Sequence, residues 1–128
     1  MRVLLDTHFV IEVIDQNLTP DRDRDHGVIA SVANQVLVSV ASIWEAAIKS
    51  RLRKLPVKTP VDQWPALLSA LGVPLLPIRE MHVLSDIGPE PDTSDPFDRL
   101  LLGVCADLNI VLLTRDRALR RHPLAWHS

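Results

Sequence analysis

Four acidic residues are the best candidates in this chain for a catalytic or metal-binding site. Each sits where an apolar, strand-like run meets a helix, or in a helix's first turn: Asp6, Glu45, Asp98 and Asp116. In an alternating strand–helix chain such junctions converge on one edge of a parallel sheet. Carboxylates gathered there repel one another unless a cation lies among them. The pattern therefore predicts a site for a divalent metal such as Mg²⁺, which prefers oxygen ligands.

Three of these acids also have a structural interpretation. Asp6 and Asp116 could each cap the N-terminus of the helix that follows. Ser42 and Glu45 have the spacing of a capping box, and Glu45 with Lys49 makes a favourable i, i+4 pair. Taken singly, each of these interpretations is reasonable.

Asp98 is harder to explain by structure alone. Asp95 followed by Pro96 is already a strong helix start, an N-cap acid with proline at the first helical position. A second acid in the same turn gains about 0.3 to 1 kcal/mol from the helix dipole, but the cap does not need it. This redundancy favours a functional role for Asp98.

Basic residues are arranged around these acids. The formal net charge of −2 does not by itself indicate a polyanion-binding protein. However, two basic groups follow Glu45 and lie around Asp116, and they could hold phosphates on either side of a metal: Lys49, Arg51, Arg53 and Lys54, then Arg115, Arg117, Arg120 and Arg121.

Other site chemistries find little support. The five histidines show no metal-ligand spacing, and the four glycines form no phosphate-binding loop. The single cysteine, Cys105, lies in an apolar helical pattern and suits a reducing compartment. Zinc binding, cysteine catalysis and nucleotide-cofactor chemistry are therefore not expected.

The elements that must position the acids follow from hydrophobic periodicity. We expect strands at 2–5, 35–40, 73–78 and 110–113, the third at an edge because prolines interrupt it and the fourth covered on both faces. Helical spacing continues from the first strand to Leu18, and further helices are expected at 28–33, 44–55, 61–71, 80–87 and 96–108. The mixed-charge segment 21–25 is expected to be a solvated loop.

This order predicts an α/β fold with a short central parallel sheet of four to five strands covered by helices on both faces. With 128 residues and 47% apolar content, the chain is expected to form a single domain over residues 1–128. No apolar stretch approaches the roughly 20 residues of a membrane span, and no signal-peptide layout is seen, so a cytoplasmic protein is expected.

Five segments carry a resemblance to a known family: LLDTH at 4–8, SVASIWEAAIK at 39–49, LRKL at 52–55, DPFDRLLL at 95–102 and LLTRD at 112–116. In this order they resemble the PIN-domain ribonucleases, specifically the VapC toxins of type II toxin–antitoxin systems. The resemblance covers essentially the whole chain. It implies a PIN-like fold and an endoribonuclease that uses Mg²⁺ (or Mn²⁺) to hydrolyse RNA phosphodiester bonds by metal-activated water.

The resemblance also implies roles for individual residues. The catalytic, metal-binding acids would be Asp6, Glu45, Asp98 and Asp116, with Thr114 as a hydroxyl beside the last acid and Asp95 as a helix cap. The basic side chains expected to contact RNA are Lys49, Arg51, Arg53, Lys54, Arg99, Arg115 and Arg117. A cognate VapB-like antitoxin that inserts a segment into the site and a homodimer are also implied.

Two features depart from related chains. Thr93 and Ser94 stand where a histidine is common, and Gly103 to Cys105 replaces a segment that is often alanine-rich. Two alternatives remain open: a phosphoaspartyl-type hydrolase with Asp6 as nucleophile, and a non-catalytic α/β interaction module whose acids only cap helices.

Overall fold

The computed structural model describes residues 1–127 and contains a four-stranded parallel sheet in the order β3-β2-β1-β4. The strands are β1 (Arg2–Leu5), β2 (Gln35–Ser39), β3 (Leu75–Leu76) and β4 (Val111–Leu113). The helices are α1 (Thr7–Ile14), α2 (Arg24–Ala30), α3 (Val40–Arg51), α4 (Trp64–Ala70), α5 (Glu80–Leu84), α6 (Pro96–Leu108) and α7 (Arg117–Arg120), with a 3₁₀ turn at Val61–Gln63.

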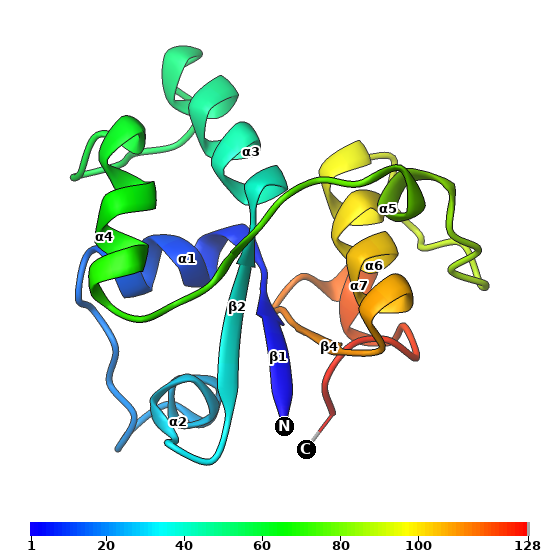
Figure 1. The fold of residues 1–128 in the computed structure, drawn as a ribbon, viewed down its shortest axis with the longest axis horizontal. Coiled ribbons are helices and arrows are strands. Elements are labelled where there is room, and N and C mark those ends of the chain that lie inside the picture. The colour runs from blue at the N-terminus through cyan, green and yellow to red at the C-terminus, as the bar shows by residue number, and fades with distance from the viewer. Residues whose placement is uncertain (128) are drawn as a thin grey trace.

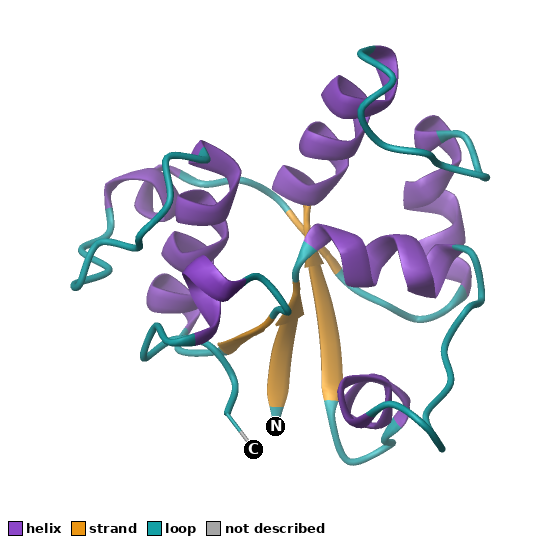
Figure 2. Ribbon diagram, turned by 180° about the vertical axis from the view of Figure 1, so that it is seen from behind, coloured by secondary structure: helices purple, strands orange, loops and turns teal. Residues whose placement is uncertain are grey.

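Helices cover both faces of the sheet (Figures 1 and 2). The helices α1, α2 and α4 lie on one side of the strands, and α5, α6 and α7 lie on the other. Side chains alternate along β1, so Val3 and Leu5 join the core under α1 and α4, while Leu4 joins the core under α6. The predicted fold class is therefore confirmed: an α/β fold with a parallel sheet between helical layers.

The two edges of the sheet are protected in different ways. The predicted edge strand β3 is confirmed, and it is two residues long because Pro74 and Pro77 flank it. The other edge strand, β4, was predicted to be covered on both faces. Residues 124–126 run beside it: the Leu112 amide donates to Leu124 O at 2.8 Å, and the Trp126 amide donates to Leu112 O at 2.8 Å.

Several predicted helix bounds were wrong. The helices predicted at 28–33, 44–55 and 80–87 are Arg24–Ala30, Val40–Arg51 and Glu80–Leu84 in the structure. The first helix ends at Ile14 rather than continuing to Leu18. The mixed-charge segment is not simply a loop, because α2 begins inside it at Arg24. The Asp23 side chain accepts hydrogen bonds from the amides of Asp25 and His26 and so caps this helix.

The packing of α6 against α5 requires glycine at position 103. A Cβ atom on Gly103 would lie 1.8 Å from the backbone oxygen of His82 in α5, far inside van der Waals contact. Glycine at this position therefore allows α5 to pack directly on α6. At its other end α6 stops at Asn109, whose φ of 55° turns the chain into β4.

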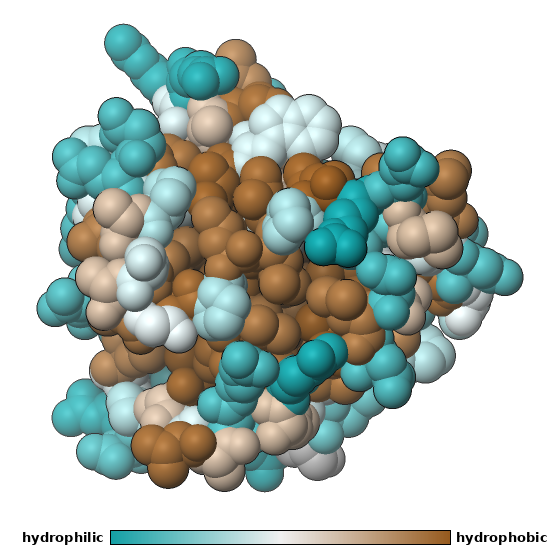
Figure 3. Space-filling view, in the orientation of Figure 1, coloured by the Kyte–Doolittle hydropathy of each residue, from teal (hydrophilic) through white to brown (hydrophobic). Residues whose placement is uncertain are grey.

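The surface is uneven in polarity. Figure 3 shows apolar residues gathered over the middle of the face seen in Figure 1.

Among residues 1–127, no helix is both long enough and apolar enough to cross a membrane.

Candidate active site

A pocket of about 400 Å³ collects the four acids that the sequence singled out. Asp6 follows β1, Glu45 lies in α3, Asp98 lies in the first turn of α6, and Asp116 precedes α7. The remaining lining residues are Thr7, His8, Ile11, Lys49, Leu55, Asp95 and Arg115. The structure thus brings the four acids together at the carboxyl edge of the sheet, and their role as metal ligands stays a prediction.

Asp6 both caps a helix and faces the pocket. It is buried, and its Oδ1 accepts a hydrogen bond from the Thr7 amide at 2.7 Å, as expected of the N-cap of α1. Its Oδ2 accepts a hydrogen bond from the Thr114 hydroxyl at 2.6 Å. Burial raises the pKa of Asp6 and outweighs the opposing effects of the Thr114 hydrogen bond and of His8.

Glu45 does not form the predicted capping box. The N-cap of α3 is Ser39, whose hydroxyl accepts a hydrogen bond from the Ala41 amide at 3.0 Å, so Ser42 and Glu45 lie inside the helix. Glu45 is buried and accepts a hydrogen bond from the Thr7 hydroxyl at 2.6 Å. The predicted i, i+4 pair between Glu45 and Lys49 is present.

Lys49 is held by acids of the pocket. Its ammonium contacts Glu45 and lies 3.7 Å from Asp95 on α6. Burial alone would lower the pKa of Lys49, but the hydrogen bond and negative charge of Glu45 outweigh it and raise the pKa. The charged ammonium group of Lys49 therefore links α3 to the N-terminus of α6 across the pocket.

Asp98 is buried and does not cap its helix. Asp95 fills that role by accepting a hydrogen bond from the Phe97 amide at 2.9 Å, as the sequence predicted. The Asp98 carboxylate accepts a hydrogen bond from the Thr93 hydroxyl at 3.1 Å, so Thr93 touches the site directly. Burial, followed by the charges of Asp95, Asp6 and Asp116, raises the pKa of Asp98 to about 7.

Asp116 lies at the exposed rim of the pocket and caps α7. Its carboxylate accepts a hydrogen bond from the Ala118 amide at 2.8 Å. The Asp116 amide donates to the Thr114 hydroxyl at 3.0 Å, while the same hydroxyl donates to Asp6. Thr114 therefore ties the positions of Asp6 and Asp116 together.

Arg115 turns away from the centre of the pocket toward a group of acids. Its Nη1 lies 2.9 Å from Glu12 Oε1, its Nη2 pairs with Asp23, and its Nε lies 3.6 Å from Asp25. The guanidinium carbon also lies 4.5 Å from the centroid of the Phe9 ring. Two of these acids belong to the segment that was predicted to be a solvated loop.

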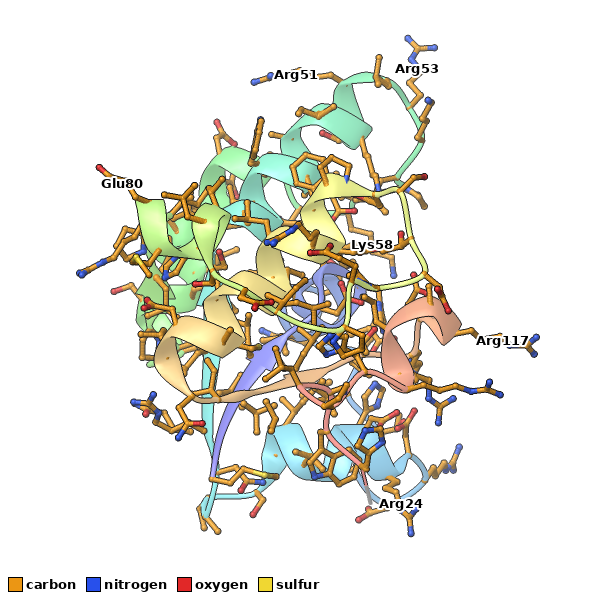
Figure 4. The ribbon with its side chains drawn as sticks, turned by 90° about the vertical axis from the view of Figure 1, so that its right-hand side faces the viewer. Arg24, Arg51, Arg53, Lys58, Glu80 and Arg117 are labelled. Carbon is orange, nitrogen blue, oxygen red and sulfur yellow. The ribbon has the colours of Figure 1, made fainter. Side chains whose placement is uncertain are left out.

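The other basic residues predicted to contact RNA lie outside the pocket. Arg99 donates to Ser85 O at 3.0 Å and lies 3.5 Å from Glu90. Figure 4 shows Arg51 and Arg53 at the outer end of α3, and Arg117 extending from α7 into solvent. Lys54, just beyond α3, is exposed. RNA contact by these residues stays a prediction.

Sequence reasoning missed two residues that line the pocket. Thr7 donates its hydroxyl hydrogen bond to Glu45, and His8 Nδ1 lies 3.7 Å from Asp6 Oδ2. The Nε2 atom of His8 is buried and has no hydrogen-bond partner among the described residues. The histidines have no ligand spacing relative to one another, and the signal that points to His8 is its position two residues after Asp6.

The side chains suit a divalent metal. Five carboxylates line the pocket against two basic side chains, Lys49 and Arg115, which leaves a formal excess of three negative charges. Carboxylate oxygens are the ligands that Mg²⁺ and Mn²⁺ prefer. In residues 1–127 no three acidic, histidine or cysteine side chains are already arranged around a common metal position. The acids that would hold a metal are Asp6, Glu45, Asp98 and Asp116, and Glu45 also contacts Lys49.

Comparison with known proteins identifies the family. A family profile described as the PIN domain matches residues 3–124, which is almost the entire chain. A search of curated proteins found no match. PIN domains are generally metal-dependent nucleases and are often found in toxin–antitoxin systems. The acid-lined pocket at the carboxyl edge of a parallel sheet is consistent with such a protein, and the chain belongs to the PIN-domain family.

Proposed function

We propose that the protein is an endoribonuclease dependent on Mg²⁺ or Mn²⁺ and that it acts as the toxin of a VapC-type toxin–antitoxin module. The observation that carries this proposal is the pocket itself. Four acids that are up to 110 residues apart in sequence line it, and two of them, Glu45 and Asp98, are buried there without capping a helix. Family membership supports the same reaction class.

In the proposed reaction the residues that would hold the metal beside an RNA phosphodiester are Asp6, Glu45, Asp98 and Asp116. A metal held there would supply Lewis-acid chemistry: it would lower the pKa of a water molecule and offset the charge on the leaving oxygen. Thr114 orients the carboxylate of Asp6 through its 2.6 Å hydrogen bond. Thr7 fixes Glu45 in the same way at 2.6 Å, so hydroxyl groups define the geometry of two acids.

The two alternatives fit less well. A phosphoaspartyl mechanism needs a second acid adjacent to Asp6 or two residues on, but the next residues are Thr7 and His8. A purely structural set of caps does not account for Glu45 and Asp98.

The remaining assignments are part of the proposal and rest on the resemblance. They are a cognate VapB-like antitoxin that occupies the acid pocket, action on RNA in the cytoplasm, and a homodimer. The apolar surface in Figure 3 supports the homodimer because contiguous exposed apolar area marks interfaces.

RNA cleavage by the purified protein tests the proposed activity. Structured RNA is incubated in Mg²⁺ or Mn²⁺, with and without EDTA, with wild type and with Asp98→Asn. We expect cleavage that EDTA abolishes and that Asp98→Asn lowers by at least about a hundredfold. Asp62→Asn, an exposed acid outside the pocket, is the matched control and should retain activity. Metal-independent cleavage, or full activity in Asp98→Asn, would overturn the mechanism.

A further inference from the structure

A positively charged face lies next to the acid pocket. We call it the arginine face; it consists of five exposed arginines from α7 and from the start of α2, namely Arg22, Arg24, Arg117, Arg120 and Arg121. They line two neighbouring hollows of about 500 and 760 Å³, and Arg120 and His127 belong to both. Figure 4 shows Arg24 and Arg117 projecting on the same side of the molecule.

The arginine face retains its charge because few acids neutralise it. Within residues 1–127, four of its members form no ion pair: Arg22, Arg117, Arg120 and Arg121. Of the acids that line the two hollows, Asp23 and Asp25 are occupied by Arg115, which leaves Asp92. By contrast, Lys49 and Arg99 are engaged by acids.

Residues 114–116 join the two sites. Thr114 lines one hollow of the arginine face and donates its hydroxyl hydrogen bond to Asp6 in the acid pocket. Asp116 lines the acid pocket and caps α7, which carries Arg117 and Arg120. The positive surface therefore begins where the negative pocket ends.

We propose that the arginine face binds the phosphate backbone of a single-stranded RNA segment and leads it to the acid pocket. This inference rests on the proposed nuclease function. Guanidinium groups bind phosphates bidentately, and several of them in a row suit a chain of phosphates. The acid pocket has a volume of about 400 Å³, and a single strand is the flexible form of RNA that can bend to bring one phosphate into it.

The proposal changes which residues should contact RNA. Arg22 and Arg120 are now expected to contact RNA. Lys49, Arg99 and Arg115 are not, because their charges are paired with acids of the protein. Arg117 remains from the prediction made on sequence.

Salt-dependent RNA binding tests this surface. A fluorescent, unstructured RNA of about 20 nucleotides is titrated with protein in EDTA, so that cleavage does not interfere. The variants are Arg120→Ala, a triple variant with Arg22→Ala, Arg120→Ala and Arg121→Ala, and the control Arg79→Ala. Arg79 is exposed and precedes Glu80, which lies on the side of the molecule opposite Arg117 in Figure 4. Thermal melting checks that each variant is folded.

The expected result is a graded loss. The triple variant should bind at least about tenfold more weakly, and the slope of log K against log salt should shrink by about two, because each phosphate contact to a single strand contributes about 0.7. Arg79→Ala should bind like wild type. Binding of the triple variant within twofold of wild type, or equal losses in Arg79→Ala and Arg120→Ala, would overturn the proposal and leave an acidic protein segment as the partner of this surface.

The binding and cleavage experiments together distinguish failure of the arginine-face proposal from failure of the proposed nuclease function. If wild type cleaves RNA with metal but the arginine variants bind RNA normally, the surface assignment fails and the nuclease stands. If the variants lose RNA binding but wild type does not cleave, the surface stands and the nuclease assignment fails.

Discussion

Asp98 shows how burial and like charge act on one residue. Its carboxylate is 6% exposed and shares the pocket with Asp6, Asp95 and Asp116, and these effects raise its pKa from 3.8 to about 7. Its ionised form is therefore costly in the metal-free protein. A bound divalent cation would reverse this effect by favouring the ionised carboxylate.

The stability of the metal-free protein should therefore depend on Asp98. Because the folded pKa lies above the unfolded one, folding favours the protonated form, and stability falls as pH rises from about 4 to about 7. At pH 8 Asp98→Asn removes this cost, and we expect urea unfolding in EDTA to show a gain of about 1 to 3 kcal/mol. Near pH 4 the gain should nearly vanish. A loss at pH 8 would contradict the repulsion described for this pocket.

Thr114 should matter through its hydroxyl group. Thr114→Val keeps the shape of the side chain but removes the hydrogen bonds with the Asp6 carboxylate and the Asp116 amide. We expect a loss of about 1 to 3 kcal/mol in unfolding free energy, because polar groups are left without partners. Thr114→Ser keeps the hydroxyl and should lose less. Equal losses in the two variants would assign the effect to packing.

The sequence predicted some helix starts correctly and others wrongly. The pair Asp95 and Pro96 was predicted to start α6 and does so, because the cap and the fixed φ of proline act locally. The same local rule placed a cap at Ser42, but the helix begins earlier, at Val40, with Ser39 as its cap. The N-cap at Asp23 was not predicted, because residues 21–25 alternate in charge and such mixed-charge segments usually lie in loops.

The contact between α5 and α6 depends on one glycine. Gly103→Ala would place a methyl group 1.8 Å from the His82 oxygen, so the helices must separate. We expect a loss of at least about 2 kcal/mol in unfolding free energy. Gly27→Ala in α2 is the control. Its Cβ would meet Pro20 O at an ordinary 3.7 Å, and alanine should stabilise the helix by up to about 1 kcal/mol. Urea or thermal unfolding of both variants measures these changes, and a Gly103→Ala variant as stable as wild type would contradict the prediction.

At the scale of the whole molecule, the sequence predicted the sheet and the edge where the acids meet. Parallel strands buried on both faces read as continuous apolar runs, and their carboxyl ends must share one edge. The charge pairing inside the site could not be predicted in this way. Arg115 pairs with Asp23, 92 residues earlier, and such a contact depends on three-dimensional packing rather than on local pattern.

The central claim is that the acid pocket is a metal centre. Calorimetric titration of Mn²⁺ into the metal-free protein tests it most directly, because it does not depend on knowing the RNA substrate. Wild type should bind Mn²⁺ with proton release near pH 7, Asp98→Asn should bind at least about tenfold more weakly, and Asp62→Asn should bind like wild type. Equal Mn²⁺ affinity in wild type and Asp98→Asn, or no binding to wild type at all, would contradict the account.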